Sequence, residues 1–286
     1  MASSDSGPSI IEFLPDLTTK KKKGVHRPIY AEVFTKPSIE DKPAKVIHLM
    51  VNPFSGKKRG EKIAEQAKAM FVDKSIVVNT FVSTYSGELI DLTANLETKD
   101  SDIVAVVGGD GSLSEVITGL MQSGKNCRVG LIPAGTGNSM ANDLKIASTE
   151  DAVTRICAGN YQSLDLAKVD MVAGLPGNEN GKLTRYSANL VTWGLGVDST
   201  IKAERMRWMG PMRYDVGILM AIMANNRRHA TLTLDGHAIE NDFTLFLIQN
   251  SQTGGSLLPL APGASLDDGI MAVSYTHLTL PTIYSV

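Results

Sequence analysis

The chain has 286 residues, of which 43% are hydrophobic and 20% are charged, and its formal net charge is -2. These values are typical of a folded protein of one large or two small domains, and they exclude a whole-chain electrostatic attraction to nucleic acid. The two cysteines, Cys127 and Cys157, are too few for a disulfide framework or a zinc site and favour a reducing compartment. No apolar run is long enough to span a bilayer, and the first residues lack the apolar core of a signal peptide.

Residues 1–44 are predicted to be an irregular N-terminal segment. Serine, proline and glycine come first, and the lysine run Lys20–Lys23 follows. Such a run is typical of a solvated tail, and contact with an anionic membrane surface is the alternative.

Over residues 45–150, short apolar runs alternate with segments of helical spacing. This alternation predicts an α/β domain in which helices cover both faces of a parallel sheet. The predicted strands are 46–51, 76–82, 103–107 and 129–132, and the predicted helices are 61–71, 88–96, 112–121 and 148–158.

Three loops of this domain, which begin at Asn52, Gly108 and Pro133, are marked by glycine or proline. Each follows a predicted strand, and ligands of such sheets bind at the carboxyl ends of the strands. The turn Gly108-Gly109-Asp110-Gly111 lets the backbone approach a bulky ligand, and the helix start behind it favours an anion. An acid among those glycines would lie beside phosphates, so the pattern indicates phosphoryl transfer. It is neither a Walker A loop nor a dinucleotide fingerprint.

Residues 151–273 are predicted to form a second, mainly antiparallel β-sandwich domain. The expected strands are 164–172, 186–193, 231–234 and 243–248, with Asp235-Gly236 as a hairpin turn, and the expected helices are 198–209 and 216–225. A ligand held by the three loops would lie in the cleft between the two domains.

Several motifs together resemble the diacylglycerol kinase catalytic-domain superfamily, and within it the sphingosine kinase and ceramide kinase branch. They are Asn52-Pro-Phe-Ser-Gly-Lys57, residues 108–120, residues 133–138 and Trp193-Gly-Leu-Gly-Val-Asp198. The stretch from Glu204 to Gly210, followed by Arg213-Tyr-Asp, is specific to that branch. The resemblance implies an N-terminal domain like that of NAD kinases and diacylglycerol kinases, followed by an apparently truncated β-sandwich domain.

The resemblance also implies the roles of residues. Asp110 matches the catalytic aspartate, which acts as general base on a lipid hydroxyl, and ATP with Mg²⁺ is the expected phosphoryl donor. Glu115 is either an indirect Mg²⁺ ligand, a residue that orders the loop, or a surface glutamate. The expected nucleotide-binding residues are Asn52, Ser55, Gly56, Thr84, Gly108, Gly109, Gly111, Gly135, Thr136, Asn138, Arg207 and Arg213.

Four residues are expected to contact the lipid: Asp198, Thr200, Met209 and Met212. Sphingosine kinases carry an acid at the position of Thr200, and its absence makes ceramide or diacylglycerol a competing substrate. The methionine-rich group from Trp208 to Met223 is interpreted either as an acyl-chain pocket or as plain core.

The family pattern ends at residue 273. Residues 274–286 do not continue it, so we expect a non-native tail that leaves the β domain incomplete and the chain poorly stable or inactive.

The leading hypothesis is an ATP-dependent lipid kinase that phosphorylates the primary hydroxyl of a sphingoid base or a related lipid. It would be cytoplasmic, would associate peripherally with membranes to reach its lipid, and would not bind nucleic acid. The alternatives are a kinase of a soluble metabolite, like NAD kinase or phosphofructokinase, and a non-catalytic lipid- or nucleotide-binding module.

Overall fold

The computed structural model describes residues 45–276 except 100, 126, 160, 176–177, 210–211, 225 and 255–257. The predicted N-terminal segment and residues 277–286 of the predicted tail lie outside the described residues. In the part of the chain that is described, no helix is long and apolar enough to cross a membrane.

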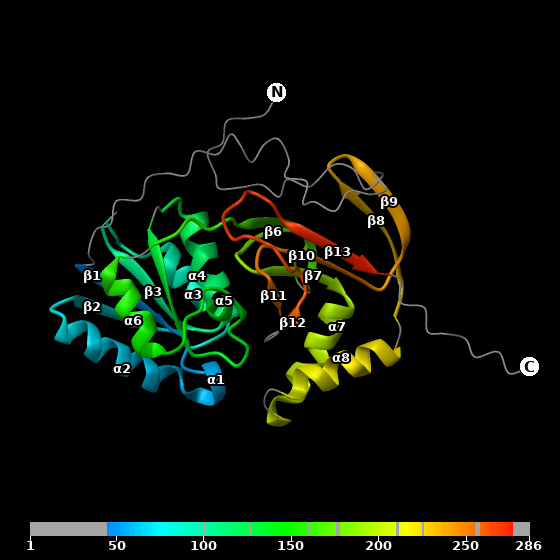
Figure 1. The fold of residues 1–286 in the computed structure, drawn as a ribbon. Helices are drawn as coiled ribbons and strands as arrows, with labels where there is room; N and C mark the ends of the chain where they lie inside the picture. Colours follow the sequence, from blue (N-terminus) through cyan, green and yellow to red (C-terminus); the bar gives the residue numbers. More distant parts are fainter. Residues whose placement is uncertain are drawn as a thin grey trace, which may run out of the picture.

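A parallel sheet of four strands forms the centre of the N-terminal half, on the left of Figure 1, and confirms the predicted α/β architecture. Its order is β2-β1-β3-β4, with β1 (Val46–Val51), β2 (Val77–Val82), β3 (Ile103–Gly108) and β4 (Arg128–Pro133). Because every pair is parallel, the loops that follow β1, β3 and β4 leave the sheet at the same edge.

Helices cover both faces of this sheet. Ile47, Leu49 and Val51 of β1 pack with α2 (Gly60–Asp73) and α6 (Thr149–Ala158), whereas Met50 packs with α3 (Glu88–Ala94) and α4 (Asp110–Gln122). The strand therefore buries successive side chains on opposite faces, which explains its continuous apolar sequence. Ser148 accepts a hydrogen bond from the Asp151 N–H at 3.2 Å and caps the first turn of α6.

The C-terminal half consists of antiparallel sheets, as predicted. A three-stranded sheet, β13-β10-β7, is formed by β7 (Leu190–Gly194), β10 (Leu245–Gln249) and β13 (Ala272–Thr276). Three further pairs are β5 (Ala167–Leu175) with β6 (Asn178–Ser187), β8 (Arg228–Leu234) with β9 (His237–Phe243), and β11 (Thr253–Gly254) with β12 (Leu258–Pro259).

Two predicted strands are each divided in the structure. The strand predicted over 186–193 is split because β6 ends at Ser187 and β7 begins at Leu190. The strand predicted over 243–248 is split because Phe243 pairs with Arg228 in one sheet and Leu245 pairs with Gly194 in another. Strand β13 runs to residue 276 and so includes three residues of the predicted tail.

Two helices pack against each other beside the three-stranded sheet. They are α7 (Leu195–Arg205) and α8 (Met212–Ala224), with the short helix η2 (Arg207–Met209) between them. A Cβ on Gly217 of α8 would lie 2.6 Å from the Ser199 carbonyl oxygen of α7, so glycine permits this close approach. The turn Asp235-Gly236 between β8 and β9 has positive φ at both residues (46° and 82°), as its hairpin sequence predicted.

The two halves contact each other through α4 and through α5 (Ser139–Asp143), the short helix that follows β4. Tyr186 of β6 is bonded to two α4 hydroxyls: its N–H donates to Thr118 Oγ1 at 3.1 Å, and its carbonyl accepts from Ser114 Oγ at 2.8 Å. Thr253 of β11 donates from its N–H and its hydroxyl to the Asp143 carboxylate of α5, at 3.1 and 2.8 Å. These bonds attach the C-terminal half to α4 and α5, the two helices that follow the glycine-marked loops after β3 and β4.

Candidate active site

Asn52 connects the loop after β1 to the start of α4. Its N–H donates to the Val107 carbonyl at 3.1 Å, and its side-chain amide donates to Ser112 Oγ at 3.0 Å. Its side-chain oxygen accepts from the Phe54 N–H at 3.0 Å, which shapes the loop as an Asx turn. This loop continues into α1 (Ser55–Lys58), an irregular turn in which Ser55 and Gly56 are buried.

The three predicted loops meet at one edge of the sheet. Gly56 has φ of 53°, and a Cβ there would collide with the Ala134 carbonyl oxygen of the loop after β4. The Ala134 N–H in turn donates to the Gly108 carbonyl at 2.8 Å. A Cβ on Gly135 would lie 2.6 Å from the Gly109 Cα, so the two glycine turns touch backbone to backbone.

Asn138 holds the loop after β4 in a tight curve. Its side-chain oxygen accepts from the Gly135 N–H at 2.9 Å, its amide donates to the Gly135 carbonyl at 3.0 Å, and its φ is 52°. Asparagine adopts this left-handed conformation more readily than most residues. Gly135 and Thr136 remain half-buried, so part of each residue is accessible at this edge of the sheet.

Asp110 is the first residue of α4, and its carboxylate lies where the glycine turns meet. Its two oxygens accept hydrogen bonds from the N–H groups of Ser139 and Met140, at 3.0 and 2.9 Å. These N–H groups belong to the first turn of α5, which would otherwise lack partners for them. The side chain is half-buried, and Gly111 beside it is exposed with open space around its Cα.

Thr84 lies in the loop that leads into α3, and Glu115 of α4 contacts the same loop. Thr84 donates to Glu88 Oε2 from its N–H and, at 2.8 Å, from its hydroxyl, and these bonds lower the pKa of Glu88. Glu115 Oε1 accepts from the Gly87 N–H at 3.1 Å, and burial raises the pKa of Glu115. Glu115 thus contacts the loop before α3, which is a different loop from the glycine turn at residues 108–111, and the roles predicted for it stay predictions.

Asp198 lies in the first turn of α7 and is part of an ion pair. Its two oxygens lie 2.9 and 3.0 Å from Arg228 Nη2, and the Asn226 amide donates to it at 3.3 Å. The bond from Arg228 lowers the pKa of Asp198, so this carboxylate is ionised and its charge is matched. Thr200 is exposed and donates its hydroxyl to the Gly196 carbonyl at 2.9 Å.

The two predicted phosphate-binding arginines lie on separate elements. Arg207 is in η2, and its side chain lies outside the described residues. Arg213 is in α8, and its guanidinium lies 3.6 Å from Glu204 of α7. Met209 is half-buried at the end of η2, and Met212 is exposed at the start of α8. The roles predicted for these residues in nucleotide or lipid binding stay predictions.

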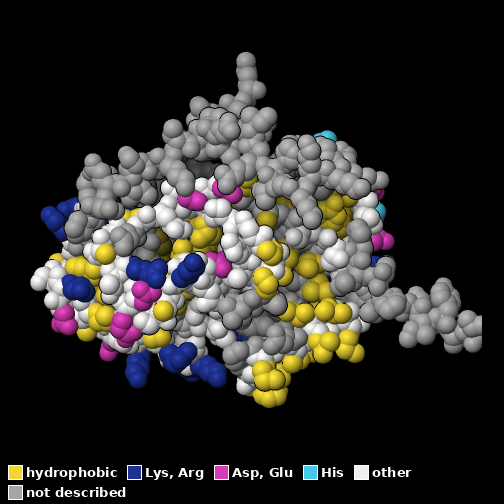
Figure 2. All heavy atoms as spheres, viewed as in Figure 1, with side chains coloured by type: hydrophobic (Ala, Val, Ile, Leu, Met, Phe, Trp, Pro, Cys, Tyr) yellow, Lys and Arg dark blue, Asp and Glu magenta, His cyan; other side chains and the backbone are white. Residues whose placement is uncertain are grey.

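An apolar patch covers the outer surface of α7, η2 and α8. It is visible at the lower right of Figure 2, where hydrophobic side chains gather over α8. Trp208 is 83% exposed and Met223 is 73% exposed, which is inconsistent with plain core. The patch consists of Val197, Ile201, Trp208, Met212, Leu219, Met220 and Met223.

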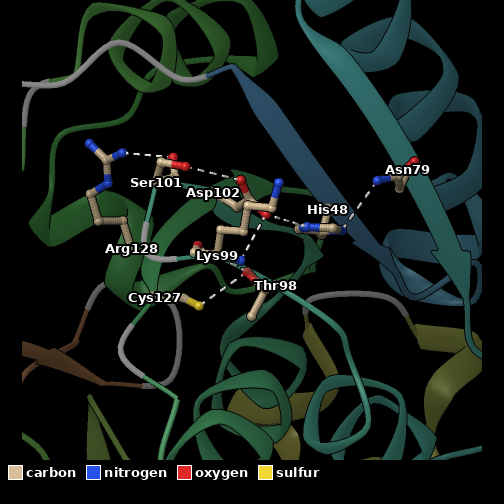
Figure 3. Close-up of polar contacts among 8 residues, drawn as sticks. All are labelled: His48, Asn79, Thr98, Lys99, Ser101, Asp102, Cys127 and Arg128. Atoms are coloured by element: carbon tan, nitrogen blue, oxygen red, sulfur yellow. Dashed lines mark hydrogen bonds and ion pairs between the residues drawn. The ribbon is translucent and has the colours of Figure 1, made fainter.

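A separate polar cluster surrounds His48, which the pattern of the sequence did not single out (Figure 3). The ring of His48 lies 3.2 Å from Asp102 Oδ2, which also accepts from the Lys99 N–H at 3.0 Å. Burial opposes the ionisation of Asp102, but these hydrogen bonds outweigh it and lower its pKa. Asp102 precedes β3, so the cluster stabilises the sheet near the end opposite the glycine turns.

Several partners of the predicted site residues come from distant parts of the chain. The N–H donors of Ser139 and Met140 lie 29 and 30 residues from Asp110, and Arg228 lies 30 residues from Asp198. The run Ser139–Asp143 carries no strong helix signal, and Arg228 is one of many basic residues. Only folding brings them to the site.

The site offers the Asp110 carboxylate as a partner for a cation. Among the described residues, no three His, Cys, Asp or Glu side chains group as a ready metal site. Mg²⁺ is commonly held by one or two carboxylates together with substrate phosphates, and each Asp110 oxygen keeps a lone pair beyond its backbone partner. Gly111, at the start of α4, is exposed and meets no atom within 4 Å, so a ligand can approach the backbone there.

Two family profiles match the chain. The diacylglycerol kinase catalytic domain matches residues 46–169, and the YegS C-terminal NAD kinase beta sandwich-like domain matches residues 189–279. A diacylglycerol kinase structure from Bacillus anthracis str. Sterne superimposes with a TM-score of 0.63 at 18% identity, covering 82% of this chain and 74% of that one.

Curated relatives include three kinds of lipid kinase. Sphingosine kinase 1 of Arabidopsis thaliana is 28% identical over 72% of this chain and 43% of its own length. Ceramide kinase of Mus musculus is 28% identical over 68% of the chain and 39% of its own length. Diacylglycerol kinase of Mycobacterium tuberculosis is 29% identical over 79% of the chain and 71% of its own length. The matched region thus spans about two-fifths of the first two proteins.

Proposed function

The chain matches a diacylglycerol kinase catalytic domain over residues 46–169 and a YegS C-terminal domain over residues 189–279, and from that premise we propose that it is an ATP-dependent lipid kinase. The proposed reaction transfers the γ-phosphoryl group of ATP to the primary hydroxyl of a sphingoid base or a related lipid such as ceramide or diacylglycerol. The observation that carries the proposal is the position of Asp110, a carboxylate at the point where three glycine-marked loops meet.

The loops would position the donor. The glycines at 108, 109 and 135 let the two turns pack against each other and against Ser112, and Gly111, which is exposed and meets no atom within 4 Å, would let phosphate oxygens approach the start of α4. Asn52 fixes the loop after β1 against α4 through Ser112. Holding the donor in this way converts binding energy into correct placement of the reacting groups.

Asp110 would accept the proton of the lipid hydroxyl. As the hydroxyl oxygen forms its bond to the γ-phosphorus, the bond from that phosphorus to the β,γ-bridging oxygen breaks, and ADP leaves with the bond electrons. The proton moves to the Asp110 carboxylate, which the two N–H groups of α5 keep in one orientation. Mg²⁺, when bound, would neutralise part of the phosphate charge.

The test is Asp110→Asn, because asparagine keeps the shape of the side chain and one of its two acceptor oxygens but cannot take the proton. We expect lipid phosphorylation from γ-labelled ATP to fall at least a thousandfold, while ATP affinity by calorimetry changes less than tenfold. Asp73→Asn, at the exposed end of α2, is the matched control and should retain full activity. Turnover by Asp110→Asn close to that of the unaltered protein would exclude the assigned role.

We also propose that the apolar patch on α7, η2 and α8 docks on a membrane surface, where the lipid substrate resides. The patch combines an exposed tryptophan with methionine and leucine, and Arg205 and Arg227 are exposed near the ends of the same helices. Tryptophan is favoured at the membrane–water interface, and arginine is attracted to anionic headgroups. Contiguous exposed apolar surface of this kind usually marks an interaction site.

A further inference from the structure

A groove along α3 forms a second cavity, separate from the candidate active site. Its volume is about 490 Å³, which is within the range of small-molecule sites. The residues that line it include Tyr85, which precedes α3, and Glu97, which follows it. None of the described lining residues comes from the three glycine-marked loops, so the groove lies outside the site that Asp110 marks.

The floor of the groove is the edge of the parallel sheet. Its lining includes His48 of β1 and Asn79 of β2, which pair in the parallel register, and Phe81, two residues further along β2. These three side chains therefore point to the same face of the sheet. Helix α3 packs on α4 and β1, whereas β2 is the edge strand beyond it, and the groove lies between α3 and this edge.

His48 presents a buried hydrogen-bond acceptor to the groove. Its side chain is 6% exposed, and Figure 3 shows its ring between Asp102 and Asn79. The ionised Asp102 can only accept, so His48 Nε2, 3.2 Å away, donates to it, and in the neutral ring Nδ1 is then an acceptor. The exposed Asn79 lies 3.5 Å from Nδ1, well beyond the usual distance of about 2.9 Å. A ligand N–H can therefore take the place of Asn79 at this atom.

The walls of the groove combine carboxylates with aromatic rings. Glu88, Asp91 and Glu97 line it, and no lysine or arginine is among the described residues that do so. Phe81 and Tyr85 also line it, and the faces of aromatic rings attract organic cations. The groove thus offers negative charge and aromatic surface together.

The spread of these groups distinguishes an organic cation from a metal ion. In the part of the chain that the structure describes, no three His, Cys, Asp or Glu side chains converge closely enough to hold a metal ion. The acceptors are instead distributed along the groove, beside the apolar side chains of Leu92 and Leu96. Such a lining fits a ligand that has a cationic group at one end and an apolar body.

We propose that this groove binds a small organic amine in its ammonium form. The apolar body lies against Phe81 and Leu92, and the N–H groups bond to the carboxylates and to His48 Nδ1. An ammonium group only donates hydrogen bonds, and the charged groups that line the groove only accept them.

Glu88 connects the groove to the candidate nucleotide site. Its Oε2 accepts from the N–H and the hydroxyl of Thr84, a residue expected to contact the nucleotide. A carboxylate can accept from several donors at once, so an amine beside Glu88 adds to these bonds and orders the segment from Thr84 to Glu88. The amine and ATP should then raise each other's affinity by the same factor. This link rests on the proposed kinase function, whereas the binding of the amine does not.

Calorimetry with three ligands that share a phenyl ring tests the site: phenethylamine is a cation, phenethyl alcohol is neutral and phenylacetate is an anion. We expect phenethylamine to bind with a Kd of about 1 mM, the alcohol to bind at least tenfold more weakly, and phenylacetate to give no heat of binding.

Two exposed carboxylates of the groove can be removed without touching the core. In the double variant Asp91→Asn with Glu97→Gln, the affinity for phenethylamine should fall about tenfold, and in Tyr85→Ala about threefold. The matched control is Glu61→Gln with Asp73→Asn, which removes two exposed carboxylates of α2 and should leave binding unchanged.

Saturating phenethylamine should lower the Kd for ATP about threefold in the unaltered protein and leave it unchanged in the groove double variant. Equal affinity for the amine and the alcohol, or equal loss in the groove and control double variants, would overturn the site. Amine binding that leaves the ATP affinity unaltered would overturn the link to the nucleotide loop. If the amine binds and requires Asp91 and Glu97 but no lipid is phosphorylated, the amine site stands and the kinase proposal fails.

Discussion

At the residue scale, Asp110 has two roles: the proposed uptake of a proton and the binding of two N–H groups of α5. The sequence motif indicates only the first of these. The glycine-flanked acid was predictable from its motif, but the two α5 N–H groups that it holds were not, because they come from a segment without a clear helix pattern. The same is true of Glu115, for which sequence alone left three roles open. Its hydrogen bond to Gly87 depends on the packing of α3 against α4.

Two substitutions of Glu115 distinguish the effect of its hydrogen bond from the effect of its charge. Glu115→Ala loses the acceptor for the Gly87 N–H, so we expect a less stable protein and a KM for ATP raised severalfold through the loop at Thr84. Glu115→Gln keeps an acceptor and should preserve the KM for ATP. Steady-state kinetics on both variants would reveal this difference, and an equal KM in the two would contradict it.

The pH dependence of the same residue has a defined sign. Burial raises the folded-state pKa of Glu115 above its ordinary value, so its contribution to stability is complete below the unfolded-state pKa and is lost as the pH rises through the folded-state value. Glu115→Gln removes this titration. Denaturant unfolding from pH 4 to pH 8 should therefore show the variant gaining stability relative to the unaltered protein as the pH rises; a constant difference would argue against a raised pKa.

At the scale of elements, the strands and helices of the N-terminal half follow their sequence patterns closely. The central strands β1 and β3 are buried on both faces, so each is an almost continuous apolar run that is easy to recognise, whereas the edge strand β2 is largely exposed and includes Asn79 and Thr80. The C-terminal half is harder because its strands are short and change partners. Phe243 and Leu245 are two residues apart in one apolar run, yet they pair in different sheets.

The contact between the two glycine turns can be tested with one methyl group. In Gly135→Ala the new Cβ would lie 2.6 Å from Gly109 Cα and 2.7 Å from Asn138 Oδ1, so the two loops must separate. We expect about 1–3 kcal/mol of lost stability in denaturant unfolding and ATP binding weakened at least tenfold by calorimetry. Gly111→Ala, which meets no atom within 4 Å, is the control for stability and should unfold at the same or a slightly higher denaturant concentration.

At the scale of the whole molecule, the three-stranded sheet β13-β10-β7 and the apolar patch are joined through helix α7. Helix α7 begins beside Thr192, carries Asp198 and continues into the exposed surface formed with α8. The sequence predicted an apolar, methionine-rich group here but left core and pocket as alternatives. Periodicity could not decide, because exposed and buried apolar faces have the same spacing on a helix.

Membrane docking through this surface can be measured without activity. Replacing Trp208 and Met223 together by serine removes two of the most exposed apolar side chains, so binding to vesicles of phosphatidylcholine and phosphatidylserine should weaken at least tenfold in a sedimentation assay. The fold should be preserved, because neither side chain is buried. Exchanging Val77, exposed on the edge strand β2, for serine is the matched control, and equal weakening by both changes would refute docking through the patch.

The hydrogen bonds from α5 to Asp110 also bear on how relatives that have lost activity are recognised. The carboxylate caps the first turn of a helix whose last residue, Asp143, is bonded to the C-terminal half through Thr253. Removing the acid would therefore loosen the attachment between the two halves as well as the chemistry. A descendant that abandoned catalysis would still be selected to keep this aspartate for folding. Inactive members of such a lineage should consequently be identified by changes in the surrounding loops. The presence of the aspartate alone does not show that a relative is an active enzyme.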